Sequence, residues 1–221
     1  LTAAGFKVHQ PVAADGEARP LCCGRTYLST GMVDKARAEA NRTIKAFKPY
    51  LQKKIPILGL EPSCLFTFKD EFLSLIDDDV APVLAKSAML LEEFLAGDGL
   101  QGFSRLKFQR TQGRVAWVHG HCHQKAFNSM DAVEQMLQRV PDLTTKMIPS
   151  GCCGMAGAFG YQSETYDASI GMAQLDLVPA LAAVDHDDWL LADGFSCRHQ
   201  ISDVTGKSPR HVAQFLARSL Q

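Results

Sequence analysis

The chain has 221 residues, 46% of them hydrophobic, and its formal net charge at pH 7 is −1. This length can bury one large core or two small ones. With 23 lysines and arginines against 24 aspartates and glutamates, no basic surface stands out for a phosphate backbone, and no segment approaches the ~20 apolar residues that cross a bilayer. We therefore expect neither a nucleic-acid partner nor a transmembrane segment.

Short apolar runs alternate with longer segments of helical spacing along the chain. The runs that predict buried strands are 5–11, 54–60, 114–120, 145–150 and 188–194. Apolar residues recur every three or four positions from Val33 to Leu51, which predicts an amphipathic helix. Residues 81–97 form the most apolar helical stretch, and Ser208 with Pro209 would begin a closing helix. This alternation indicates an α/β fold with mostly parallel sheets.

Most of the seven cysteines follow a predicted strand: Cys64, Cys122, Cys152, Cys153 and Cys197. Residues just beyond the carboxyl ends of parallel strands line the crevice where ligands bind, so we expect the thiols to meet there. An odd number of scattered cysteines favours reduced metal ligands over a disulfide framework. A disulfide between two adjacent cysteines would form a strained ring and brace nothing.

The cysteines repeat one pattern twice. A Cys-Cys-Gly segment is followed at a similar distance by a third cysteine, first as Cys22, Cys23 and Cys64, then as Cys152, Cys153 and Cys197. Cys122 precedes the second set, and its counterpart would lie about eight residues before Leu1, so we expect the chain to begin within a longer protein. We predict a first module at 1–100 and a second at 101–221, with the seam near 96–114.

The second module offers four thiolates, which suit a tetrahedral zinc ion or an iron–sulfur cluster: Cys122, Cys152, Cys153 and Cys197. No C-x2-C pair of the kind common in structural zinc sites occurs. A cluster needs a close approach of the backbone, which Gly151, Gly154, Gly157 and Gly160 permit, and a helix beginning after Cys153 would direct its positive end at the cluster. The plainer interpretation is that the cysteines are buried as small hydrophobic residues.

Histidines and cations lie near these cysteines in the sequence. His119, His121 and His123 surround Cys122, and we expect all three on one side of an extended strand end, as ligands or as donors to backbone groups. Further cations follow the cysteines, where they would stabilise a reduced cluster or form surface ion pairs: Arg25, Lys125, Arg198 and His199.

These residues resemble the cysteine-rich CCG domain found in heterodisulfide reductase and in the iron–sulfur subunit of glycolate oxidase. The family motif runs C, CCG and C-x-x-C; here Gln200 stands where the last cysteine of the second repeat would be, and Thr67 takes that place in the first. The resemblance implies two tandem pseudo-repeated modules, each a small, mostly parallel sheet flanked by helices. It also implies a [4Fe-4S] cluster in the second module and an incomplete metal set in the first, at Cys22, Cys23 and Cys64.

Longer segments, such as LCCGRTYLSTGMVDKARAEA and HGHCHQKAF, look like the C-terminal part of FAD-linked 2-hydroxy-acid dehydrogenases fused to iron–sulfur domains. The resemblance implies an upstream flavin domain with FAD and a ferredoxin-like domain. This fragment would pass electrons towards a quinone or another acceptor, without being catalytic alone, in the cytoplasm or at the inner face of the membrane. The alternatives are a structural zinc module and a thiol/disulfide reductase of the heterodisulfide reductase type.

Overall fold

The computed structural model describes residues 1–221, which form two compact units, Leu1–Phe94 and Leu95–Gln221. Each unit is described by itself below. No helix in either unit combines the length and the apolar character that crossing a membrane requires.

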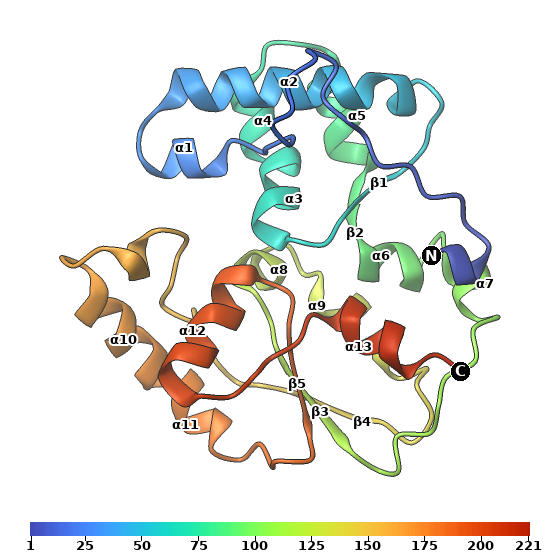
Figure 1. The fold of residues 1–221 in the computed structure, drawn as a ribbon, viewed down its shortest axis with the longest axis vertical. Coiled ribbons are helices and arrows are strands. Elements are labelled where there is room, and N and C mark those ends of the chain that lie inside the picture. Colours follow the sequence, from blue (N-terminus) through green and yellow to red (C-terminus); the bar gives the residue numbers. More distant parts are fainter. The chain divides into compact units, whose positions relative to one another are not determined.

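The first unit is mainly helical and contains one two-stranded sheet (Figure 1). Its elements are a short 3-10 helix η1 (Thr2–Ala4), α1 (Arg25–Ser29), α2 (Val33–Leu51), β1 (Ile57–Gly59), α3 (Pro62–Lys69), α4 (Glu71–Leu75), α5 (Val80–Ser87) and β2 (Ala88–Leu90), with α6 (Leu91–Ala96) at its end. Strands β1 and β2 are parallel, and Ile57 pairs with Ala88.

Helix α2 has the predicted bounds, and its apolar stripe builds the core of the first unit. The side chains of Ala36, Ala40, Ile44 and Phe47 face inward and pack with residues of α3, α4 and α5. Val33, at the start of the predicted stripe, is exposed. The burial of this stripe, rather than helix propensity alone, stabilises the long helix.

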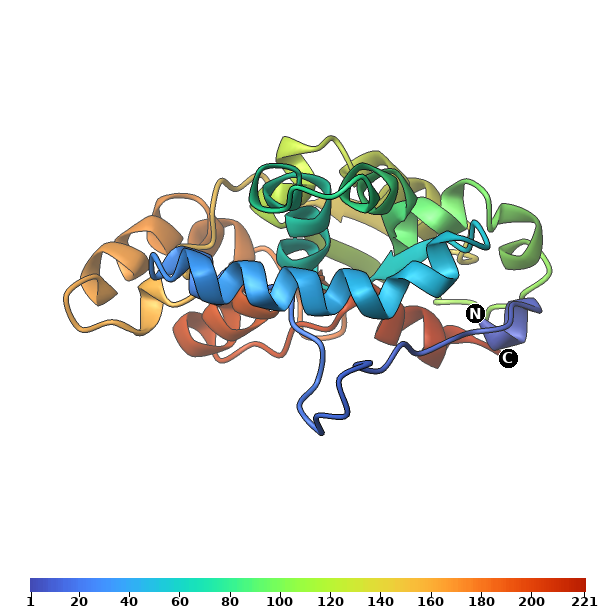
Figure 2. The same ribbon diagram turned by 90° about the horizontal axis from the view of Figure 1, so that it is seen from above.

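The second unit is a three-stranded parallel sheet with helices on both faces (Figures 1 and 2). Its elements are α7 (Leu100–Phe103), β3 (Val115–His119), α8 (Cys122–Ala126), α9 (Met130–Leu137), β4 (Thr144–Met147), η2 (Phe159–Tyr161), α10 (Tyr166–Leu175), α11 (Leu177–Leu181), β5 (Trp189–Ala192), α12 (Phe195–Thr205) and α13 (Val212–Ser219). The strand order is β4-β3-β5. The predicted α/β class, with small parallel sheets flanked by helices, is thus confirmed.

Both units repeat one local order. In the first, β1 leads into α3, which carries Cys64, and the chain then returns as β2 parallel to β1. In the second, β5 leads into α12, which carries Cys197, and the chain returns at Arg210, which forms a parallel bridge to Leu191. The pseudo-repeat of the cysteines is therefore also a repeat of backbone path.

Three sequence predictions about elements are wrong. Residues 5–11 form no strand, and Val8 is exposed. The apolar stretch 81–97 is not one helix, because Ala88–Leu90 leave it to pair with β1. The last helix begins at Val212 rather than near Ser208, since Arg210 exchanges backbone hydrogen bonds with β5 and is held extended; His211 then caps the helix.

Candidate metal centre

The carboxyl ends of the three strands in the second unit bring four cysteines together. Cys122 is the first residue of α8, directly after the central strand β3. Cys152 and Cys153 follow β4 on one side, and Cys197 lies in the first turn of α12, after β5 on the other side. A parallel sheet puts these ends at one edge, and this is why cysteines far apart in sequence meet. All four are free thiols.

The four sulfurs form a chain of thiol–thiol contacts. A hydrogen bond with Cys152 raises the pKa of Cys122, while the Cys122 and Cys153 thiols lower the pKa of Cys152. The same contact raises the pKa of Cys153, and the Cys153 thiol holds the pKa of Cys197 well below its usual range. Protons are therefore shared between neighbouring sulfurs, which places negative charge on alternate members of the set.

His119 lies against the buried end of this chain. Its Nδ1 is 2.9 Å from Ser150 Oγ, whereas its Nε2 is buried and has no hydrogen-bond partner. A ring nitrogen of His119 and the sulfurs of Cys153 and Cys197 all lie within 4.8 Å of one another. A buried imidazole nitrogen without a partner is costly, so this atom is well suited to face a bound group.

The other two histidines do not lie along an extended strand, as the sequence predicted. His121 is the N-cap of α8, where its Nδ1 accepts the backbone N–H of His123 at 3.1 Å. The two rings stack with centroids 5.1 Å apart, and burial lowers the pKa of His121. Ligand atoms of His121, Cys122 and His123 lie within 4.8 Å of one another, so both interpretations of these histidines, as ligands or as partners of backbone groups, keep support.

The glycines after Cys152 differ in what they do. Gly154 has a φ of +92°, and an added Cβ would lie 2.1 Å from the backbone oxygen of Ser169 on α10. Gly157 has a φ of +68° and open space around it, while Gly151 is exposed and donates its N–H to Asp176. Gly160 packs closely against Met155. The helix expected directly after Cys153 is absent, because positive φ at Gly154 turns the chain into a loop.

Two contacts that the sequence did not indicate also shape the site. An added Cβ on Gly194 would lie 2.4 Å from a ring carbon of His121 and 3.1 Å from the sulfur of Cys197, so only glycine fits there. The ammonium of Lys125, half-buried, donates to the backbone oxygens of Ser150 and Gly151. Lys125 thus fastens the loop before Cys152, a role that its neighbourhood to Cys122 in sequence hinted at only as a charge.

The remaining cations make local contacts. Arg25 forms an ion pair with Glu71 at 2.5 Å, which supports the plainer of the two interpretations given to it. Arg198 donates to the backbone oxygens of Ala192 and Asp193 and so joins α12 to the end of β5. His199 is exposed and packs against Phe195, with ring centroids 4.3 Å apart.

Gln200 occupies the place of the missing family cysteine and is buried. Its amide nitrogen donates to Ser169 at 3.1 and 3.3 Å and lies beside Gly154. An amide in this place binds α12 to α10 instead of offering a fifth thiol. The second unit therefore holds four thiols, not the five of the full motif.

The three cysteines of the first unit form a smaller group. Cys23 and Cys64 have their sulfurs 3.2 Å apart, and Cys22 accepts the N–H of Gly24 at 3.4 Å. The hydrogen bond from Cys64 lowers the pKa of Cys23 to about 7 and raises that of Cys64. His9, the nearest histidine in the sequence, packs against Tyr50.

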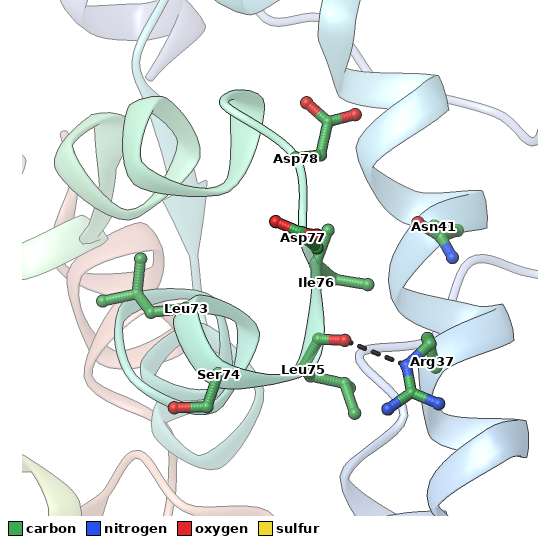
Figure 3. A pocket seen from close by; sticks show the side chains of 8 residues that line it. All are labelled: Arg37, Asn41, Leu73, Ser74, Leu75, Ile76, Asp77 and Asp78. Atoms are coloured by element: carbon green, nitrogen blue, oxygen red, sulfur yellow. Dashed lines mark hydrogen bonds between the residues drawn. The ribbon is translucent and has the colours of Figure 1, made fainter.

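A hollow elsewhere in the first unit contains no candidate ligand. Figure 3 shows this cavity of about 610 Å³, lined by Arg37 and Asn41 of α2 and by residues 73–78. Arg37 spans it and donates to the backbone oxygen of Leu75 at 3.1 Å. No cysteine or histidine lines it, so the chemistry of the chain lies with its thiols.

Comparisons with known proteins agree with these features. The model of the CCG cysteine-rich domain family matches residues 10–69 and 116–202. The chain is 25% identical over 194 residues to a D-2-hydroxyglutarate dehydrogenase of Pantoea ananatis, which covers 87% of the chain and 18% of that protein. It is 25% identical over 202 residues to a subunit of the anaerobic glycerol-3-phosphate dehydrogenase of Escherichia coli, covering 90% and 49%. The chain thus spans half or less of these relatives. No solved structure matches it.

Proposed function

Because the chain belongs to the CCG cysteine-rich domain family, we propose that its second unit holds a [4Fe-4S] cluster and transfers electrons within a larger oxidoreductase. The ligands are Cys122, Cys152, Cys153 and Cys197. The observation that carries this proposal is the meeting of four free thiols from three adjacent strand ends. Four thiolates are the usual ligand set of such a cluster, which supplies one-electron transfer when bound.

The surroundings of the thiols fit a bound anionic group. The buried Nε2 of His119 lacks a partner, and the bare backbone at Gly194 leaves room beside Cys197. Lys125 holds the loop at Ser150 and places a positive charge near all four thiols, where it favours negative charge. Cys153 and Cys197 are buried, so this side of the site excludes water.

The relatives support electron transfer rather than one substrate. They carry names with different substrates, D-2-hydroxyglutarate and glycerol 3-phosphate, yet each covers about nine-tenths of this chain. A segment common to both is better suited to passing electrons than to recognising either substrate. We propose that a flavin domain with FAD and a ferredoxin-like domain supply the electrons, and that a quinone or another acceptor takes them.

One observation favours a second candidate, a structural zinc ion. His119, Cys153 and Cys197 place their ligand atoms within 4.8 Å of one another. Donors bound to one zinc at 2.0–2.3 Å lie about 4 Å apart, so this group is compact enough for a single ion. In that case the second unit would depend on the metal for its stability and would carry no electrons.

Metal analysis of anaerobically prepared protein separates these proposals. After reconstitution with iron and sulfide we expect about four irons and four sulfides for each chain, as four-thiolate ligation of a cubane requires. Serine at Cys122, Cys152, Cys153 or Cys197 should reduce this content severalfold, whereas Cys22→Ser, in the first unit, should retain it. One zinc without sulfide would favour the structural ion, and no metal after either loading would contradict both.

A further inference from the structure

Beyond metal binding in the second unit, we propose that Cys23 and Cys64 of the first unit are a redox-active dithiol that closes to a disulfide when a peroxide oxidises it. The two sulfurs are already in contact at 3.2 Å. A disulfide bond is 2.03–2.05 Å long, so closure requires a movement of about 1 Å. The bond would join the loop before α1 to the first turn of α3.

The backbone around this pair is fixed in the geometry that brings the sulfurs together. Gly24 has a φ of +79°, and an added Cβ would lie 2.9 Å from the backbone oxygen of Ala36 on α2. Thr43, also on α2, donates its hydroxyl to the backbone oxygen of Cys22 at 2.9 Å. Both contacts hold the loop against α2, so Cys23 stays opposite Cys64.

The same contacts select Cys64 as the partner of Cys23. Cys22 accepts the N–H of Gly24 through its sulfur. A disulfide between Cys22 and Cys23 would form the strained ring of adjacent residues. Cys64 comes from a separate helix and meets Cys23 without this strain.

The surroundings also disfavour a metal ion here. Three thiols lie in this unit, and Thr67 stands where the family motif has a further cysteine. The hydroxyl of Thr67 donates to Ser63 at 2.8 Å, and the guanidinium of Arg25 lies 3.4 Å from it. A cation beside the pair opposes a metal cation and stabilises a sulfur anion.

The reaction balances with hydrogen peroxide as the oxidant. The sulfur of Cys23 attacks one peroxide oxygen, the O–O bond breaks, and water leaves as the Cys23 sulfenic acid forms. The sulfur of Cys64 then attacks the Cys23 sulfur, the S–O bond breaks, and a second water leaves. Two thiols lose two electrons and two protons, and one peroxide becomes two waters. Cys23 is only 7% exposed, so a small oxidant of this class is required.

Peptide mapping after peroxide treatment tests the proposal on the full chain. Reduced, anaerobic protein is treated with hydrogen peroxide, the remaining thiols are alkylated, and the linked peptides are measured by mass spectrometry. We expect a Cys23–Cys64 linkage at least tenfold more abundant than any linkage of Cys22. Cys22→Ser should retain it, and Cys64→Ser should leave a Cys23 sulfenic acid that a diketone reagent traps.

Two results would overturn the proposal. One is a linkage of Cys22 as the main product, or no linkage in the first unit at a peroxide excess. The other is a metal ion that stays with Cys22, Cys23 and Cys64 after Cys153→Ser has removed the metal of the second unit. Neither result bears on the cluster proposed for the second unit, whose iron content is measured separately.

Discussion

At the scale of single residues, Gly154 links the thiol loop to its support. Its positive φ turns the chain directly after Cys153, and its missing side chain lets the loop pack on Ser169 of α10 and on Gln200 of α12. Gly157, three residues further on, also has a positive φ but touches nothing within 4 Å of an added Cβ. The two glycines therefore separate the cost of backbone conformation from the cost of close packing.

We expect Gly157→Ala to lower the free energy of unfolding of the second unit by about 1 kcal/mol, the usual cost of a left-handed conformation with a side chain. Gly154→Ala should cost at least ~3 kcal/mol, because the loop must also move away from α10. Both tryptophans, Trp117 and Trp189, lie in the second unit, so their fluorescence during urea unfolding measures this difference. Equal losses for the two variants would show that packing at Gly154 has no special role.

At the scale of elements, Gln124 joins two of the strand ends that carry cysteines. Its side-chain oxygen accepts the N–H of His121 at 3.0 Å, and its nitrogen donates to Asp193 at 2.8 Å. Asp193 in turn accepts the N–H of Val212, the first residue of α13. One buried amide thus fixes α8, the end of β5 and the start of α13 together.

Gln124→Met keeps the volume of this side chain and removes both hydrogen bonds. We expect it to lower the free energy of unfolding by about 2–3 kcal/mol, because it leaves a buried N–H and a carboxylate oxygen unsatisfied. Gln214→Met removes the similar capping contact of the exposed Gln214 with His211 on α13 and should cost about 0.5–1 kcal/mol. Urea unfolding followed by tryptophan fluorescence compares the two variants, and a loss at Gln124 no larger than at Gln214 would contradict this account.

The elements show which parts of the fold can be predicted from sequence. Strands β1, β3, β4 and β5 and helix α2 are predictable because each is a local apolar pattern. Strand β2 is not, since Ala88–Leu90 look like a continuation of the preceding helix and become a strand only by pairing with β1. Arg210 likewise delays the last helix through a bridge to a distant strand.

The candidate site divides in the same way. The cysteines that meet are predictable, because thiols after parallel strands reach one edge of a sheet. The roles of Lys125, Gln124 and Gly194 depend on contacts with groups distant in sequence, Gly151, Asp193 and His121 among them. No local pattern marks such contacts. His121 also escapes prediction as a helix cap, since histidine is not among the usual capping residues.

At the scale of the whole molecule, each unit has its own core and its own set of thiols. The core of the first unit is built on α2, and that of the second includes Cys153 and Cys197 themselves. The two cysteine sets share a pattern in sequence and a backbone path, but they differ in completeness. The first has three thiols, with one close pair, and the second has four. We infer that the duplicated module serves two chemistries, a dithiol in the first unit and a metal centre in the second.

This division predicts that the two sets can be removed separately. A chain with serine at Cys22, Cys23 and Cys64 should still bind about four irons after anaerobic reconstitution, since its four-thiolate site is intact. A chain with Cys153→Ser should lose that iron and still form the Cys23–Cys64 linkage with peroxide. Iron analysis and peptide mapping of both variants, with circular dichroism to confirm that each is folded, make the measurement. If the parent chain bound about eight irons and the triple variant about four, the first unit would hold a cluster of its own, and the two modules would share one chemistry.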